Sequence, residues 1–175
     1  MLLSKQPAKT VLAAYVELLK PNIMSLVLVT TVLGYYLGGD GINSWFNLVV
    51  TLIGTAFTAG GSGALNHYLE RDTDALMERT KNRPIPAGII SPSNALMFGI
   101  LLVLCGSTLL VWKINTLTAF LSILTAFLYI LVYTPMKKIT WLNTSVGSIP
   151  GAIPPLGGWA AATGHLDFGA WVLFF

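Results

Sequence analysis

Long apolar runs alternate with short polar segments along the chain. Each run is close to the roughly 17 to 25 residues that a bilayer-spanning helix needs. The five complete runs are Ile23 to Leu37, Trp45 to Leu65, Ala95 to Trp112, Leu117 to Tyr133 and Val146 to Ala162, and a sixth opens at Ala170. Because hydrocarbon offers no water to a bare backbone, each run is predicted to form an α-helix. The expected fold class is an all-α, polytopic membrane helical bundle.

The composition agrees with this pattern. Hydrophobic residues make up 54% of the 175 residues and charged residues only 10%, and the mean hydropathy is +0.72. A soluble domain carries about 25% charged residues, so the composition excludes a soluble enzyme. The single cysteine, Cys105, lies inside an apolar run and is interpreted as a packing residue.

The basic residues predict the orientation of the bundle. If the N-terminus is cytoplasmic, nine of the ten Lys and Arg residues lie on the cytoplasmic side and only Lys113 lies outside. Positive charge concentrates on the cytoplasmic side of membrane proteins. The apolar side chains between Lys9 and Lys20 cover one helical face, so this segment is predicted to lie along the membrane surface before Pro21 opens the first span.

Small residues recur at four-residue spacing in the second run, at Ala56, Gly60 and Ala64. Such a stripe lets a neighbouring helix approach closely, and helix packing is the favoured interpretation over contact with a substrate. The nearby Gly60 to Gly63 cluster is not a nucleotide-binding loop, because neither a strand nor a Gly-Lys-Ser/Thr sequence accompanies it.

The most highly charged stretch is Asn66 to Pro86, which holds four of the seven acidic and four of the ten basic residues. Asn66, Glu70 and Asp74 are spaced so that one helical face presents all three. Such a stripe of oxygen ligands suits Mg²⁺, which takes one or two protein carboxylates and fills its other positions with water and phosphate oxygens. The stretch therefore predicts a metal–diphosphate site.

Other residues of this stretch have other predicted roles. The cations Arg79, Lys81 and Arg83 follow the acidic stripe and could hold the phosphate oxygens that a metal leaves free. Asp72 lies about 120° from the stripe on the same helix and ranks below Glu70 and Asp74 as a ligand. His67 is interpreted first as an interfacial hydrogen-bonding residue. The simpler alternative for the whole stretch is a solvated loop between two spans.

Two further segments add to this picture. The fourth run ends in YTPMKK, which returns Lys137 and Lys138 to the cytoplasmic face. The stretch Asn143 to Trp159 carries three prolines inside a predicted span, so we expect this helix to be kinked or interrupted. Irregular backbone at membrane depth is tolerated where it lines a cavity. The stretch is therefore expected to line a substrate chamber.

Together, Asn66 to Pro86, YTPMKK and NTSVGSIPGAIPPLGGW resemble the UbiA superfamily of intramembrane prenyltransferases. Within that superfamily they resemble the heme O synthase branch, mainly through the last of the three stretches. The resemblance implies a helical bundle around a membrane cavity, a farnesyl diphosphate bound through Mg²⁺, and transfer of the farnesyl group to a vinyl group of heme B (protoheme IX), with water added on the heme side.

The resemblance also implies roles for individual residues. Asn66, Glu70 and Asp74 would bind the metal and act in catalysis, together with Lys137. The residues that would contact the diphosphate are Arg79, Lys81, Arg83, Tyr133 and Lys138. Two positions depart from the usual family pattern: Glu70 stands where Asp is usual, and His67 where Asn or Asp is common. Because Glu keeps the charge, metal binding is expected to survive with a changed geometry.

The resemblance also implies a location and partners. The protein would lie in the bacterial cell (inner) membrane, with its N-terminus and acidic stripe cytoplasmic, and could be coupled to heme A synthase or to terminal oxidase assembly. The family has a second acidic motif in its C-terminal half, which this sequence does not reach. Residues 1–175 are therefore expected to form the N-terminal part of a single membrane domain that is inactive alone.

Three alternatives stay open at this point. A prenyltransferase acting on an aromatic quinone precursor would share the acidic stripe. A non-catalytic membrane subunit would explain the short chain, and its function would survive mutation of Glu70 and Asp74. Half of a transporter could also show broken helices and charge, but it would place the polar groups near the midplane of the membrane rather than at one interface.

Overall fold

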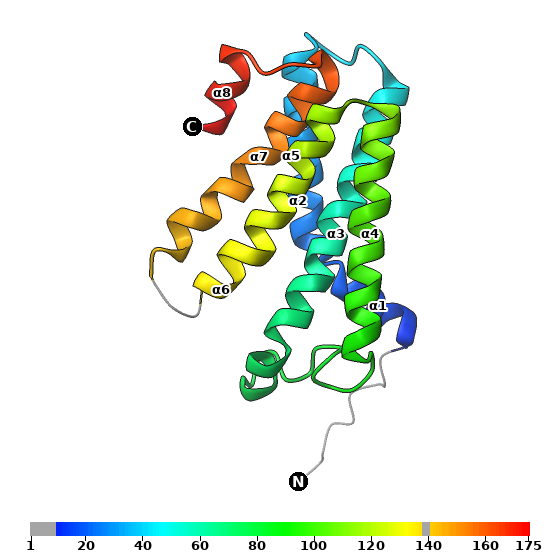
Figure 1. The fold of residues 1–175 in the computed structure, drawn as a ribbon, viewed down its shortest axis with the longest axis vertical. Coiled ribbons are helices and arrows are strands. Elements are labelled where there is room, and N and C mark those ends of the chain that lie inside the picture. The colour runs from blue at the N-terminus through cyan, green and yellow to red at the C-terminus, as the bar shows by residue number, and fades with distance from the viewer. Residues whose placement is uncertain (1–9, 138–140) are drawn as a thin grey trace.

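The computed structural model describes residues 10–137 and 141–175. The predicted all-α fold is confirmed: the described chain is a bundle of helices (Figure 1). Its elements are α1 (Val11–Leu18), α2 (Pro21–Gly38), α3 (Trp45–Leu76), α4 (Pro92–Lys113), α5 (Thr116–Phe127), the π-helix η1 (Leu128–Tyr133), α6 (Thr134–Met136), α7 (Asn143–Thr163) and α8 (Phe168–Phe174).

Among the described residues, four helical segments are long and apolar enough to cross a membrane. They are Pro21–Gly38, Trp45–Leu76, Pro92–Lys113 and Thr116–Met136. These segments contain the first four predicted runs. The fifth run forms α7, a helix of 21 residues that is not in this group; its sequence is rich in Gly, Pro and Ser. The chain is a multi-pass membrane protein.

The prolines do not interrupt α7, so of the two predicted outcomes, a kinked or an interrupted helix, the interruption is wrong. Pro150, Pro154 and Pro155 all lie inside one helix, although each lacks the N–H that a helix interior normally uses. The helix packs backbone to backbone against α2, since a Cβ added to Gly34 would overlap the carbonyl oxygen of Pro155. This close packing along α2 offsets the missing hydrogen bonds and keeps α7 continuous.

Glycines bring α3 and α4 together along their length. A Cβ on Gly106 would lie 2.6 Å from the carbonyl oxygen of Gly54, and one on Gly61 would lie 2.7 Å from that of Gly99. Small residues at such contacts let two helix backbones approach closely. The α3–α4 pair forms one side of the bundle (Figure 1).

The predicted stripe of small residues packs against a different helix. Gly60 contacts the side chain of Leu19, and Ala64 is fully buried in a cluster with Ala14 and Leu18 of α1. The packing role predicted for this stripe is therefore confirmed, and it fixes α1 and the start of α2 against the middle of α3. This contact positions the two residues between α1 and α2, Leu19 and Lys20.

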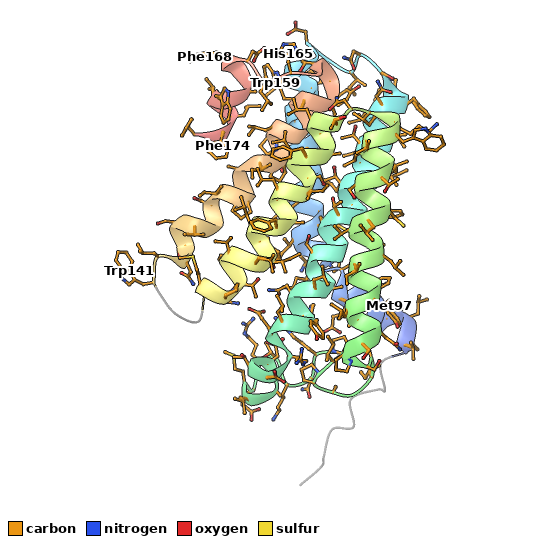
Figure 2. The ribbon with its side chains drawn as sticks, in the orientation of Figure 1. Met97, Trp141, Trp159, His165, Phe168 and Phe174 are labelled. Atoms are coloured by element: carbon orange, nitrogen blue, oxygen red, sulfur yellow. The ribbon has the colours of Figure 1, made fainter. Side chains whose placement is uncertain are left out.

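At the far end of the bundle, α8 turns back beside α7 (Figures 1 and 2). The indole of Trp159 lies between Gly38 of α2 and Gly169 of α8, each of which would clash with it if it carried a Cβ. Phe174 packs against the buried cluster that includes Leu156. These contacts hold α7 against the bundle at the end opposite the charged residues.

Candidate active site

The acidic stripe lies on one continuous helix, because α3 extends to Leu76, well beyond the end of the predicted span. Asn66, Glu70 and Asp74 are all buried, with relative exposures of 2%, 6% and 4%. An ionised carboxylate is costly to bury unless it is paired and hydrogen-bonded. The solvated-loop alternative does not fit this burial, and the stripe must have partners.

Arg83 is the first of these partners. Its Nη1 donates to Oδ2 of Asp74 at 2.6 Å and lies 3.8 Å from Oε2 of Glu70. The segment after α3 brings the guanidinium back to the stripe through a series of turns, in which the Thr80 hydroxyl donates to the carbonyl oxygen of Asp74 at 3.0 Å. One guanidinium thus serves both carboxylates.

The end of the fourth span supplies a second cation and a tether. Nζ of Lys137 lies 3.2 Å from Oε1 of Glu70. The Asn66 amide donates to the Thr134 hydroxyl at 2.9 Å, and this hydroxyl in turn donates to the carbonyl oxygen of Tyr129 at 2.8 Å. That second bond spans the π-helix η1, a type of helix that is rare and is often found at functional sites.

Lys20 completes the cluster from the other side. Its ammonium group donates to Oδ1 of Asn66 and, at 3.2 Å, to the Tyr129 hydroxyl. The backbone of Lys20 is left-handed, with φ of 53°, a conformation that is strained for a residue with a side chain and that clusters at functional sites. Burial lowers the pKa of Lys20 to about 8, although the charge of Glu70 acts in the opposite direction.

The cluster carries an excess of positive charge. Two carboxylates, Glu70 and Asp74, face three cations, Lys20, Arg83 and Lys137; Lys20 touches the stripe through Asn66. Such a set can accept an anion, and the carboxylates can at the same time accept a divalent cation that accompanies it. The arrangement suits a metal-bound diphosphate better than a lone metal ion.

The oxygen ligands fit Mg²⁺ by their chemistry. Within the described part of the chain, no group of three His, Cys, Asp or Glu side chains could hold a metal. The candidate ligands are the three members of the stripe on α3: the Asn66 amide oxygen and the carboxylates of Glu70 and Asp74. These oxygens are hard ligands of the kind Mg²⁺ prefers. Because the protein supplies only a few ligands, other coordination positions of the metal stay open for phosphate oxygens.

Several residues predicted for the site make other contacts. Arg79 is exposed, and Lys81 pairs at 2.7 Å with Glu78, which is itself exposed. The side chain of Asp72 is 84% exposed, in agreement with its lower rank as a ligand. Lys138 lies outside the described residues. Diphosphate binding by Arg79, Lys81 and Lys138 stays a prediction.

His67 is buried beside the stripe, and its Nδ1 has no hydrogen-bond partner among the described residues.

Three residues of the cluster are not predicted by the sequence analysis: Lys20, Tyr129 and Thr134. The Lys20-Pro21 pair at the start of the first span is the local signal for Lys20, which the sequence otherwise presents as one of nine cytoplasmic cations at the end of a surface segment.

A cavity of about 480 Å³ extends from this cluster into the bundle. Tyr129 and Tyr133 stack at 5.7 Å along its wall. The expectation that the proline-rich stretch lines a chamber is confirmed, since α7 contributes to the wall. The other walls come from α2, α3 and α5, and the lining includes Met24, Val27, Thr31, Ala59, Ser62, Leu121, Thr125, Pro150, Gly151, Ile153 and Pro154.

The model of the UbiA prenyltransferase family matches residues 27–175. The chain belongs to this family. The predicted resemblance is thereby confirmed, and the buried stripe and cavity are features of a UbiA-family chain.

Two curated relatives carry the same name, protoheme IX farnesyltransferase. The protein from Salinispora tropica is 45% identical over 172 residues, covering 98% of this chain and 54% of the relative. That from Salinibacter ruber is 49% identical over 160 residues, covering 91% of this chain and 56% of the relative. The chain thus spans about half the length of the curated relatives it matches.

Two solved structures share the fold. A structure of digeranylgeranylglyceryl phosphate synthase superimposes with a TM-score of 0.77 at 17% identity, covering 94% of this chain and 57% of that one. A UbiA homologue from Archaeoglobus fulgidus, bound to DMAPP and Mg²⁺, gives a TM-score of 0.72 at 19% identity and covers 91% and 58% of the two chains.

Proposed function

We propose that the protein containing this chain transfers the farnesyl group of farnesyl diphosphate to a vinyl group of protoheme IX (heme B), giving heme O. The observation that carries the proposal is the 45% and 49% identity, over more than nine-tenths of this chain, to proteins named protoheme IX farnesyltransferase. The buried acidic stripe with its surrounding cations supports it independently, because that arrangement suits a metal-bound diphosphate.

Within this proposal, Asn66, Glu70 and Asp74 hold Mg²⁺, and Arg83, Lys137 and Lys20 hold the diphosphate oxygens. The bound metal would neutralise charge on the leaving diphosphate. Arg83 and Lys137 already contact Glu70 at 3.8 and 3.2 Å, so a diphosphate bound beside that carboxylate lies within reach of both. Tyr133, which lines the cavity, would contact the diphosphate, as the resemblance implies.

The proposed reaction separates charge. Breaking the allylic C–O bond leaves negative charge on the diphosphate and positive charge on the farnesyl fragment. Preorganised cations at the leaving group stabilise that developing negative charge. The cavity wall, formed largely by side chains such as Val27, Leu121 and Ile153, shelters the cationic fragment from bulk water.

The proposal extends to the setting of the enzyme. We place the protein in the bacterial cell membrane with the acidic stripe on the cytoplasmic side, on the basis of the nine-to-one distribution of basic residues. Farnesyl diphosphate would then reach the stripe from the cytoplasm and heme B from the membrane. A coupling to heme A synthase or to terminal oxidase assembly would consume the product.

The test is a competition between acceptors. The protein expressed from its own gene is reconstituted in liposomes with Mg²⁺ and labelled farnesyl diphosphate, and heme B and 4-hydroxybenzoate are supplied together. The proposal predicts label on heme. Label on the benzoate would assign the protein to the quinone-precursor prenyltransferases, and label on neither acceptor would favour a non-catalytic membrane subunit.

A further inference from the structure

Two polar stripes line the cavity beyond the acidic cluster. On α3 the stripe consists of Thr58 and Ser62 and leads to Asn66. On α5 and η1 it consists of Ser122, Thr125 and Tyr129. A farnesyl chain is hydrocarbon and does not need hydroxyl partners, so these stripes call for another explanation.

The two stripes run in the same direction because α3 and α5 are parallel (Figure 1). At the deep level, the hydroxyl oxygens of Thr58 and Ser122 lie 2.6 Å apart and bond directly. At the level of the acidic cluster, one ammonium nitrogen, that of Lys20, bridges Asn66 and Tyr129. The two stripes thus touch directly at the deep level, and about two helical turns away they are joined only through the Lys20 ammonium group.

Ser62 and Thr125 occupy the level between these two contacts. Each hydroxyl donates its proton to its own helix, Ser62 to the carbonyl oxygen of Thr58 at 2.7 Å and Thr125 to that of Leu121 at 2.8 Å. A hydroxyl has one proton and two lone pairs, so both oxygens can only accept a further bond from the cavity. A ligand that bonds to both must bring two O–H or N–H donors.

The geometry points to a water molecule held between Ser62 and Thr125. Water has two donors, and it is the smallest ligand that can bond to both hydroxyls at once. Both residues line the cavity. With both protons bonded to these hydroxyls, its lone pairs are free toward the cavity. That is the orientation a nucleophilic water needs, and the level lies one turn, about 6 Å, from Asn66.

This inference rests on the proposed function and assigns that water a role in it. The π electrons of the heme vinyl group form a bond to C1 of the farnesyl chain, and the electron pair of the C1–O bond leaves with the diphosphate. Positive charge then lies on the vinyl carbon next to the ring. The water oxygen forms a bond to that carbon, giving an oxonium. One O–H group of the oxonium then breaks its bond to a hydroxyl of the protein and gives its proton to the released diphosphate, which leaves the hydroxyethylfarnesyl substituent.

Another hydroxyl of the cavity lies too deep for this role. The Thr118 hydroxyl is buried and has no partner among the described residues, but it precedes Thr125 by seven residues, or about 10 Å of helix. Ser62 and Thr125 are therefore positioning residues for water at the depth of the reacting carbons, next to the diphosphate cluster.

The test compares products rather than rates alone. In the protein expressed from its own gene, Ser62→Ala combined with Thr125→Val removes both acceptors. Without the positioned water, the cationic adduct loses a proton instead, and the product is lighter by the mass of one water molecule. We expect the ratio of hydroxylated to dehydrated product, measured by mass spectrometry, to fall about tenfold or more. The conservative Ser62→Thr variant should retain the wild-type ratio.

Thr51→Val is the matched control, because this buried hydroxyl on α3 also donates to its own helix, to Asn47 at 2.7 Å, but does not line the cavity. An unchanged ratio in the double variant overturns the water site and leaves the proposed function standing. No farnesylated heme from the wild type overturns both. If the double variant does not fold, a high-resolution structure of the wild type decides: a water within hydrogen-bonding distance of both hydroxyls supports the inference, and its absence overturns it.

Discussion

Replacing Asp74 by Asn tests whether the acidic stripe is a buried electrostatic centre or a solvated surface. The Asp74 carboxylate is 6% exposed and accepts from Arg83 at 2.6 Å, while the guanidinium itself is 22% exposed. Removing one partner of a buried pair costs about 3–5 kcal/mol, because the other charge is left unpaired. Glu70 remains 3.8 Å from the guanidinium, so we expect the lower end, about 3 kcal/mol.

Asp72→Asn is the matched control, two residues away on the same helix. Its carboxylate is 84% exposed and lies 3.6 Å from Nε of Arg71. Exposed ion pairs contribute at most about 1 kcal/mol. The two variants remove the same charge by the same chemical change, so any difference between them comes from burial and partners.

The assay is thermal unfolding of the protein expressed from its own gene, in detergent and without Mg²⁺, followed by tryptophan fluorescence. At about 2–4 °C per kcal/mol for 150–250 residues, and less for a longer chain, Asp74→Asn should lower the Tm by up to about 6–12 °C and Asp72→Asn by less than about 4 °C. Equal Tm shifts in the two variants would refute the reasoning, since burial of the Asp74 carboxylate would then add nothing to the free energy of unfolding.

Three further predictions concern the cluster, the helix packing and the cavity. Lys20→Met removes the ammonium that binds Asn66 and Tyr129; binding of a farnesyl diphosphate analogue, measured by titration, should weaken about tenfold or more, whereas Lys113→Met should leave it unchanged. Gly61→Leu forces a side chain against the backbone of α4, where an added Cβ lies only 2.7 Å from a carbonyl oxygen; unfolding should show a loss of about 1–3 kcal/mol. Gly151→Trp should fill part of the roughly 480 Å³ cavity and suppress farnesyl transfer to heme, whereas Gly151→Ala, whose Cβ meets no atom within 4 Å, should retain it.

The sequence predicts those features that depend on neighbours along the chain. The apolar runs become helices because length and hydropathy leave no other form in a membrane. Asn66, Glu70 and Asp74 share one face because four-residue spacing is local to a helix. The low rank of Asp72 follows from the same geometry, and its side chain is indeed exposed.

Contacts between distant segments could not be predicted in the same way. Lys20 reaches Asn66 across 46 positions and Tyr129 across 109, and both contacts depend on how α1 packs against α3. Because of the turns after α3, Arg83 rather than the equally charged Lys81 contacts the carboxylates of the stripe. The continuity of α7 depends likewise on its packing against α2, which its prolines alone do not reveal.

We predict that the acidic stripe and its cations bind a diphosphate together with Mg²⁺. The most direct test is calorimetric titration of the protein, expressed from its own gene, with a farnesyl diphosphate analogue whose scissile oxygen is replaced by sulfur. We predict that binding requires Mg²⁺ and weakens about tenfold or more in Glu70→Gln. Binding of equal strength without Mg²⁺, or in the variant, would contradict the account.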